Sequence, residues 1–101
     1  MPLADLMMIW DRYGLVDEIY LVGAAGEPSL ETQAEVLPLD PHRERTFDGR
    51  TYLLGIEQVR DAVTGLEAQL GRPTTAPERL RAVVHYARYD AFIDPGKATT
   101  G

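Results

Sequence analysis

Apolar residues recur every three or four positions at the start of the chain, and this spacing predicts a helix. The stripe consists of Leu3, Leu6, Met7, Trp10 and Tyr13. Positions with this spacing lie on one face of an α-helix, which buries them against a core. Gly14 follows directly, and we expect it to end the helix in a left-handed conformation.

The next two apolar segments predict a β-hairpin. Glu18–Val22 is short and rich in β-branched and aromatic residues, and in residues 30–37 apolar and polar side chains alternate. This alternation places Glu31 and Glu35 together on a solvent-exposed face of the second strand. The glycine-rich connection, residues 23–28, is interpreted as a turn and not as a phosphate loop. It has no following Gly-Lys-Ser/Thr, and no helix opens behind it.

The middle of the chain predicts a loop, a short strand and a second helix. Residues 40–50 are polar and contain the turn-forming pair Asp48-Gly49, whereas residues 51–54 fit a third short strand. Residues 56–70 carry apolar side chains at helical spacing, and Gly71 is placed to end that helix. We therefore predict an α+β fold, a small antiparallel sheet of two or three strands packed against three helices.

The third helix has a clear start and an unusually apolar surface. Thr75 and Glu78 are spaced as a capping box. Two apolar stripes follow, one of Leu80, Val83, Val84, Ala87 and Ala91, and one of Tyr86, Tyr89 and Ile93. We expect Tyr86, Ala87 and Ala91 to be buried. Tyr86 and Tyr89 are also candidate partner-binding residues, because a helix apolar on two sides either packs twice or leaves a strip for a partner. Residues 1–101 are expected to form one domain, with residues 95–101 as a flexible tail.

The net charge of −6 is concentrated in one part of the sequence. Residues 1–40 hold eight acids and one base, a net charge of −7, whereas residues 41–101 hold eight acids and nine bases, a net charge of +1. An acidic segment of this kind attracts a basic protein surface and repels nucleic acid. The candidate contact residues are Glu27, Glu31, Glu35 and Asp40. The alternative, that the acidity only keeps the protein in solution, stays open at this point.

The residues suited to catalysis are few and scattered. Cysteine is absent, Ser29 lies outside any nucleophile motif, and neither His42 nor His85 has neighbours at metal-ligand spacing. Asp90 and Asp94 are four residues apart at a helix end, a position that favours a structural pair over an acid–base pair. We therefore expect no catalytic residues, no metal, no cofactor and no enzyme activity.

The beginning of the sequence favours a cytoplasmic location. Residues 1–5 lack a basic region, and the apolar run over residues 6–10 is too short for a secretion signal or a membrane span. We accordingly expect no membrane partner.

Two segments resemble a family of small bacterial proteins. They are Tyr-Leu-Leu-Gly-Ile-Glu-Gln-Val-Arg-Asp-Ala-Val at residues 52–63 and His-Tyr-Ala-Arg-Tyr-Asp-Ala-Phe-Ile at residues 85–93. Members of this family resemble immunity proteins of contact-dependent growth inhibition and related polymorphic toxin systems. The resemblance implies binding without shared catalytic residues. One departure is that residues 42–45, His-Arg-Glu-Arg, stand where relatives are often acidic.

These observations favour an immunity protein that binds and neutralises a cognate toxin. We expect the toxin domain to be a nuclease with a basic cleft, against which an acidic surface can mimic phosphate charge. Two alternatives remain at this stage. One is an adaptor or oligomerising subunit of a bacterial complex, and the other is a small hydrolase built on His85, Asp90 and Asp94. The oligomeric state is left open.

Overall fold

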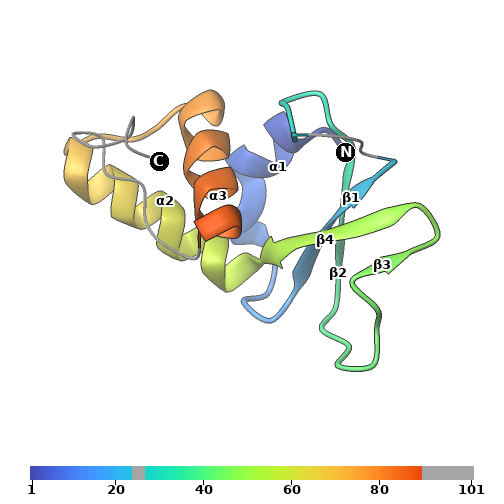
Figure 1. Cartoon of the computed structure of the whole chain (residues 1–101). Coiled ribbons are helices and arrows are strands. Elements are labelled where there is room, and N and C mark those ends of the chain that lie inside the picture. Colours follow the sequence, from blue (N-terminus) through green and yellow to red (C-terminus); the bar gives the residue numbers. More distant parts are fainter. Residues whose placement is uncertain (24–26, 90–101) are drawn as a thin grey trace.

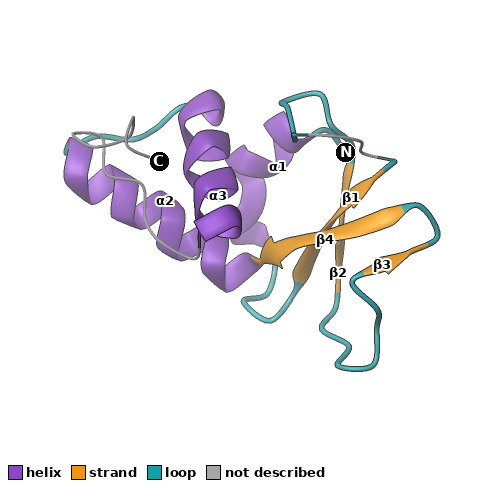
Figure 2. Cartoon of the chain, viewed as in Figure 1, coloured by secondary structure: helices purple, strands orange, loops and turns teal. Residues whose placement is uncertain are grey.

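The computed structural model describes residues 1–23 and 27–89, and it confirms the predicted α+β class (Figure 1; Figure 2). A four-stranded antiparallel sheet is accompanied by three α-helices and one short 3₁₀ helix. The elements in chain order are α1 (Leu3–Ile9), η1 (Trp10–Arg12), β1 (Glu18–Val22), β2 (Ala34–Leu37), β3 (Thr46–Phe47), β4 (Arg50–Gly55), α2 (Ile56–Leu70) and α3 (Ala76–Tyr89). Residues 90–101, which include the expected tail, lie outside the described part.

The sheet has the strand order β2-β1-β4-β3, so the two predicted hairpin strands are neighbours at one side. The strand that the sequence did not predict is β3, which pairs with β4 through only two residues. The turn between them has φ angles of 45° at Asp48 and 72° at Gly49. Two positive φ angles match the right-handed twist of a tight hairpin, so this turn sets the pairing.

The ends of the helices follow the predicted signals in two of three cases. Gly71 has φ 69° and its N–H donates to the Glu67 carbonyl oxygen over 2.8 Å, which confirms the left-handed end of α2. The Thr75–Glu78 capping box at the start of α3 is also present. The prediction for Gly14 was wrong. The first helix tightens into η1, and the Gly14 N–H instead donates to Oδ2 of Asp17 over 3.0 Å.

The core lies between one face of the sheet and the three helices, which Figure 1 shows grouped on one side of the strands. Ile19, Leu21 and Leu54 point into it from the sheet. A bulge between Ile19 and Tyr20 shifts the pairing with β4, so Leu53 as well as Leu54 contacts the core. The helices contribute Leu3, Leu6, Met7, Ile56, Val59, Ala62, Val63, Leu66, Leu80, Ala82 and Val83.

The buried face of α3 agrees with the predicted stripe at Leu80 and Val83 but departs from it elsewhere. Ala82 and Val83 are buried, Tyr86 is half-buried against the core, and Ala87 is exposed. The prediction that Ala87 is buried was therefore wrong, and Ala91 lies outside the described residues. The reason is that α3 packs against both α1 and α2, and these two contacts turn the Ala82 side of the helix inward.

The opposite face of the sheet is covered by arginines instead of helices. Tyr20 packs edge-to-face with Phe47 and Tyr52, with ring centroids 5.3 and 5.6 Å apart. Above these rings lie the guanidinium groups of Arg43, Arg45 and Arg50, the closest being that of Arg45, 4.1 Å from the centre of the Tyr52 ring. Tyr20 is only 2% exposed as a result. Cation–π contacts and arginine stems thus shield a small aromatic cluster from water.

Each helix within the described ranges is too short or too polar to cross a bilayer.

Candidate partner-binding site

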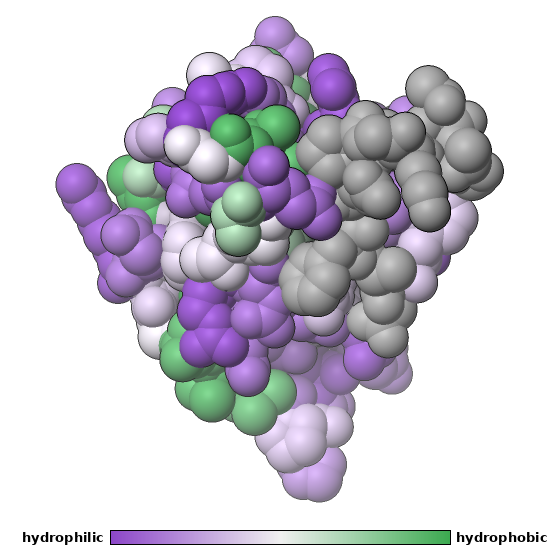
Figure 3. All heavy atoms as spheres, turned by 90° about the vertical axis from the view of Figure 1, so that its left-hand side faces the viewer, coloured by the Kyte–Doolittle hydropathy of each residue, from purple (hydrophilic) through white to green (hydrophobic). Residues whose placement is uncertain are grey.

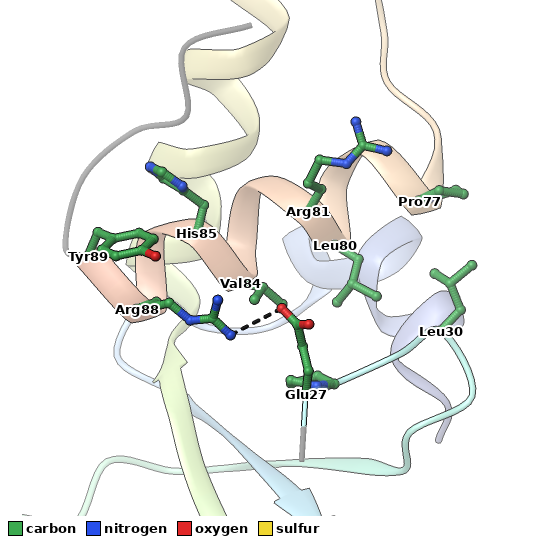
Figure 4. A pocket seen from close by; sticks show the side chains of 10 residues that line it. Glu27, Leu30, Pro77, Leu80, Arg81, Val84, His85, Arg88 and Tyr89 are labelled. Atoms are coloured by element: carbon green, nitrogen blue, oxygen red, sulfur yellow. Dashed lines mark hydrogen bonds and ion pairs between the residues drawn. The ribbon is translucent and has the colours of Figure 1, made fainter. Parts of the chain in front are cut away.

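An open groove of about 380 Å³ lies between α3 and residues 27–30 (Figure 4). Its floor is apolar and consists mainly of Leu30, Leu80 and Val84, with Pro28 and Pro77 beside them. Leu80 and Val84 are one helical turn apart, so they present adjacent side chains from the same side of α3.

Both walls of this groove are held by the core. The α3 wall is fixed because Ala82 and Val83, on the inward side of the same helix, are buried. The other wall is fixed to α1, since the Ala4 N–H donates to the Leu30 carbonyl oxygen over 3.0 Å. A local turn, in which the Ser29 N–H donates to Oγ1 of Thr32 over 2.9 Å, shapes the same segment. The groove is therefore a preformed feature of the fold.

The rim of the groove is charged, and one ion pair crosses it. Nη2 of Arg88 donates to Oε1 of Glu27 over 3.1 Å, and Figure 4 shows this contact on the side of α3 toward which Leu80 and Val84 point. The pKa of Arg88 is raised, first by its hydrogen bond to Tyr89 and next by the charge of Glu27. Both members of the pair are more than half exposed, so water screens the attraction and the bond is easily exchanged.

The other edge of the groove carries Arg81 and His85, which extend from α3 away from Glu27 in Figure 4. The His85 ring contacts Tyr89 with centroids 4.9 Å apart. Arg81 is exposed and forms no ion pair with any of residues 1–23 or 27–89. Among the described residues, the rim thus has three basic side chains and one acid, Glu27, which is already paired.

Two of the six predicted partner-binding residues, Glu27 and Tyr89, meet at this groove. Tyr89 lines the groove and is 50% exposed, whereas Tyr86 packs inward against the core. Glu31 is exposed and lines a neighbouring shallow hollow together with Glu27. The structure therefore brings three of the predicted residues to one region of the surface.

The remaining two predicted acids lie elsewhere. Glu35 forms a two-pronged ion pair with Arg50 on the arginine-covered face of the sheet, and this hydrogen bonding lowers the pKa of its carboxyl group. Asp40 accepts the backbone N–H of His42 over 2.9 Å in the loop before β3. These two carboxylates are consequently not part of the groove.

Three of the eight acids in residues 1–40 form ion pairs with arginines from the rest of the chain. Glu18, Glu27 and Glu35 pair with Arg43, Arg88 and Arg50, respectively. Asp5 and Asp11 remain exposed, with Met8 (49% exposed) between them in sequence. The acids of residues 1–40 that are exposed and form no ion pair within the described residues are therefore Asp5, Asp11, Glu31 and Asp40.

The helical side of the molecule is mainly hydrophilic. In Figure 3, which turns this side toward the viewer, apolar residues outside the grey atoms form small separate patches. Among residues 1–23 and 27–89 there is no group of three histidines or acids that could hold a metal ion. Asp90 and Asp94, which the hydrolase alternative needs, lie outside these ranges.

No family model, no curated protein and no solved structure matches the chain.

The sequence pattern did not predict that Leu80 and Val84 border a groove, or that Arg81 lies on its rim. Leu80 is buried, as the apolar stripe predicts, and Val84 is half-buried against the core. A usable signal was present, because Arg81, His85 and Arg88 form a basic stripe directly beside Leu80 and Val84. The position of Leu30 opposite them depends on a tertiary contact between residues 27–30 and α3.

Proposed function

We propose that this protein neutralises a bacterial toxin by binding to it, in the manner of an immunity protein. The observation that carries the proposal is the groove on α3, at which an apolar floor is bordered by arginine, histidine and tyrosine. The segment at residues 85–93, which resembles the immunity-like family, supplies three of the groove residues, His85, Arg88 and Tyr89.

The composition of the groove suits a protein partner. Protein–protein interfaces combine a small apolar centre with a polar rim, and tyrosine and arginine are enriched among the residues that contribute most to affinity. Leu80 and Val84 supply the apolar centre, and Arg88 and Tyr89 lie on its border. Because the walls are preformed, binding costs little ordering of the groove itself.

The acidic surface near the groove suits a toxin with a basic cleft. The segment that carries Glu31 is hydrogen-bonded to the start of α1, since the Leu3 N–H donates to the Thr32 carbonyl oxygen over 2.8 Å. Glu31 is thereby held at the end of the molecule that also carries Asp5 and the exposed Met8. Carboxylates in such a position accelerate encounter with a basic surface.

The experiment is co-expression with the C-terminal domain of the protein encoded immediately upstream, which the proposal expects to be a toxin. We expect growth in the presence of this protein and arrest in its absence, and we expect the two purified proteins to elute as one complex. Size-exclusion chromatography of this protein alone addresses the adaptor alternative. A stable homo-oligomer that neither binds nor protects against the toxin would favour an oligomerising subunit.

A further inference from the structure

We propose that the groove takes an acidic–apolar segment of the partner. One apolar side chain of that segment sits on Leu30, Leu80 and Val84, and a neighbouring carboxylate binds Arg81 and His85. This inference rests on the proposed function only in taking the partner to be a protein. The chemistry of the segment follows from the groove.

The apolar part of the inference comes from the size and lining of the groove. A volume of about 380 Å³ that is open to solvent accommodates a leucine-sized side chain together with the backbone that carries it. Val84 is half-buried and lies beside Leu80 on the floor. Leu80 itself is buried, so a partner covers mainly the half-buried Leu30 and Val84, and removing their apolar surface from water favours association.

The acidic part comes from the charges on the rim. Arg81 and His85 are one helical turn apart on α3, so both can donate to a single carboxylate. Arg81 has no acidic partner within the described part of the chain, and Glu27, the one acid among the described residues of the rim, is occupied by Arg88. An acidic segment therefore meets a cation that pairs with no acid of residues 1–23 or 27–89, and a basic segment meets like charge.

The Arg88–Glu27 pair makes this inference sharply testable. If Glu27 contacted a basic partner residue, removing its charge would weaken binding. If the groove takes an acidic segment, Glu27→Gln releases Arg88 as a second free guanidinium and strengthens binding. The two possibilities predict opposite signs for the same variant.

The probes are three short acetylated and amidated peptides that share one leucine and differ only in flanking Glu, Gln or Lys residues. Binding is followed by the methyl NMR signals of Leu30, Leu80 and Val84 in the full-length protein. We expect the Glu peptide to bind with a dissociation constant of about 1 mM or tighter, the Gln peptide more weakly and the Lys peptide most weakly.

Variants assign the two parts of the interaction. Arg81→Gln should raise the dissociation constant of the Glu peptide about threefold to tenfold and leave that of the Gln peptide unchanged. Glu27→Gln should lower the dissociation constant of the Glu peptide by a similar factor. Val84→Ala should weaken the binding of all three peptides. The control is Arg60→Gln on α2, where Arg60 pairs with Asp61, and this variant should bind all three as the wild type does.

Three results would overturn the inference. The first is that the Lys peptide binds as tightly as the Glu peptide or more tightly. The second is that the Glu27→Gln variant binds the Glu peptide more weakly than the wild type does. The third is that millimolar peptide leaves the methyl signals unshifted. Each leaves the proposed function standing if the wild type still neutralises the toxin. Conversely, if the peptides bind as predicted but the protein does not neutralise the toxin, the proposed function is contradicted and the groove chemistry is supported.

Discussion

Arg79 on α3 donates from Nη1 to the backbone carbonyl oxygen of Met7 on α1 over 2.9 Å. The same guanidinium donates to Oγ1 of Thr74 over 3.0 Å and to Oε2 of Glu67 over 3.3 Å. Thr74 is 5% exposed and also donates twice to Glu67. One side chain therefore joins all three α-helices and holds the α3 wall of the groove in register with α1, to which Leu30 is attached.

Arg79→Met should lower the free energy of unfolding by about 1–3 kcal/mol, because it leaves the Met7 carbonyl and the Glu67 carboxylate without their charged donor. The matched control is Arg81→Met on the same helix, which should change it by less than about 0.5 kcal/mol because Arg81 is exposed. Urea denaturation of the two variants measures the difference. Equal effects would show that the Arg79 cluster does not stabilise the helices.

Two alanines on α3 test which face of this helix is buried. Ala82→Asp should destabilise the protein by several kcal/mol, on the order of 3 or more, because it places a carboxylate where the side chain is 1% exposed. Ala87→Asp should have little effect because Ala87 faces solvent. Thermal unfolding monitored by circular dichroism gives both values. If Ala87→Asp lost more stability than Ala82→Asp, the buried face would be the one that the apolar pattern predicts.

The sequence pattern predicted most elements of the fold because those elements depend on local signals. The Gly71 end, the Thr75 cap and the Asp48-Gly49 turn all act within a few residues of the structure they determine. The pattern could not predict β3, which has two residues and no alternation. It also misjudged Ala87, because the small alanine side chain fits either a buried or an exposed position and the docking of α3 onto α1 decides between them.

The charge distribution on the surface was less predictable because it is set by distant pairs. Glu35 and Arg50 are 15 residues apart, and Glu27 and Arg88 are 61 residues apart. A charge count along the chain treats these four residues as independent, although folding neutralises them in pairs. The acids and the arginine, Arg81, that have no ion pair among the described residues can be identified only after the pairs are known.

The stability of the protein should fall in acid partly through Glu67 and Glu78. Hydrogen bonds from Thr74 lower the pKa of Glu67, and the bond from Arg72 is the first cause that lowers the pKa of Glu78 to about 2, from an ordinary value of 4.5. A lowered folded-state pKa stabilises the fold above the unfolded pKa. That contribution is lost as the pH falls, over about 4.5 to 2 for Glu78.

Melting temperatures measured across this range test the assignment. Glu78→Gln and Glu67→Gln should each melt lower than the wild type at neutral pH and lose less stability on acidification. Glu44→Gln is the control, since Glu44 is exposed and forms no ion pair with the described residues. If all three variants kept the wild-type acid profile, these carboxylates would not account for it.

Association with a basic toxin surface should depend on the unpaired acids and not on Glu35. Asp5→Lys combined with Glu31→Lys should slow association by about tenfold at low salt and reduce its salt dependence, because both carboxylates are exposed at one end of the molecule. Glu35 is left intact, since its loss would free Arg50. Stopped-flow kinetics at several salt concentrations gives the slopes. Identical rates and slopes would mean that this surface only aids solubility.

The central claim, that this protein neutralises a toxin by contact, is tested most directly by titrating the purified toxin domain with it while toxin activity is measured. We predict that activity falls in proportion to the protein added and is abolished near one equivalent. The wild type should act without turnover, and Arg81→Gln should require more protein for the same inhibition. A toxin that keeps full activity in the presence of excess protein would contradict the account.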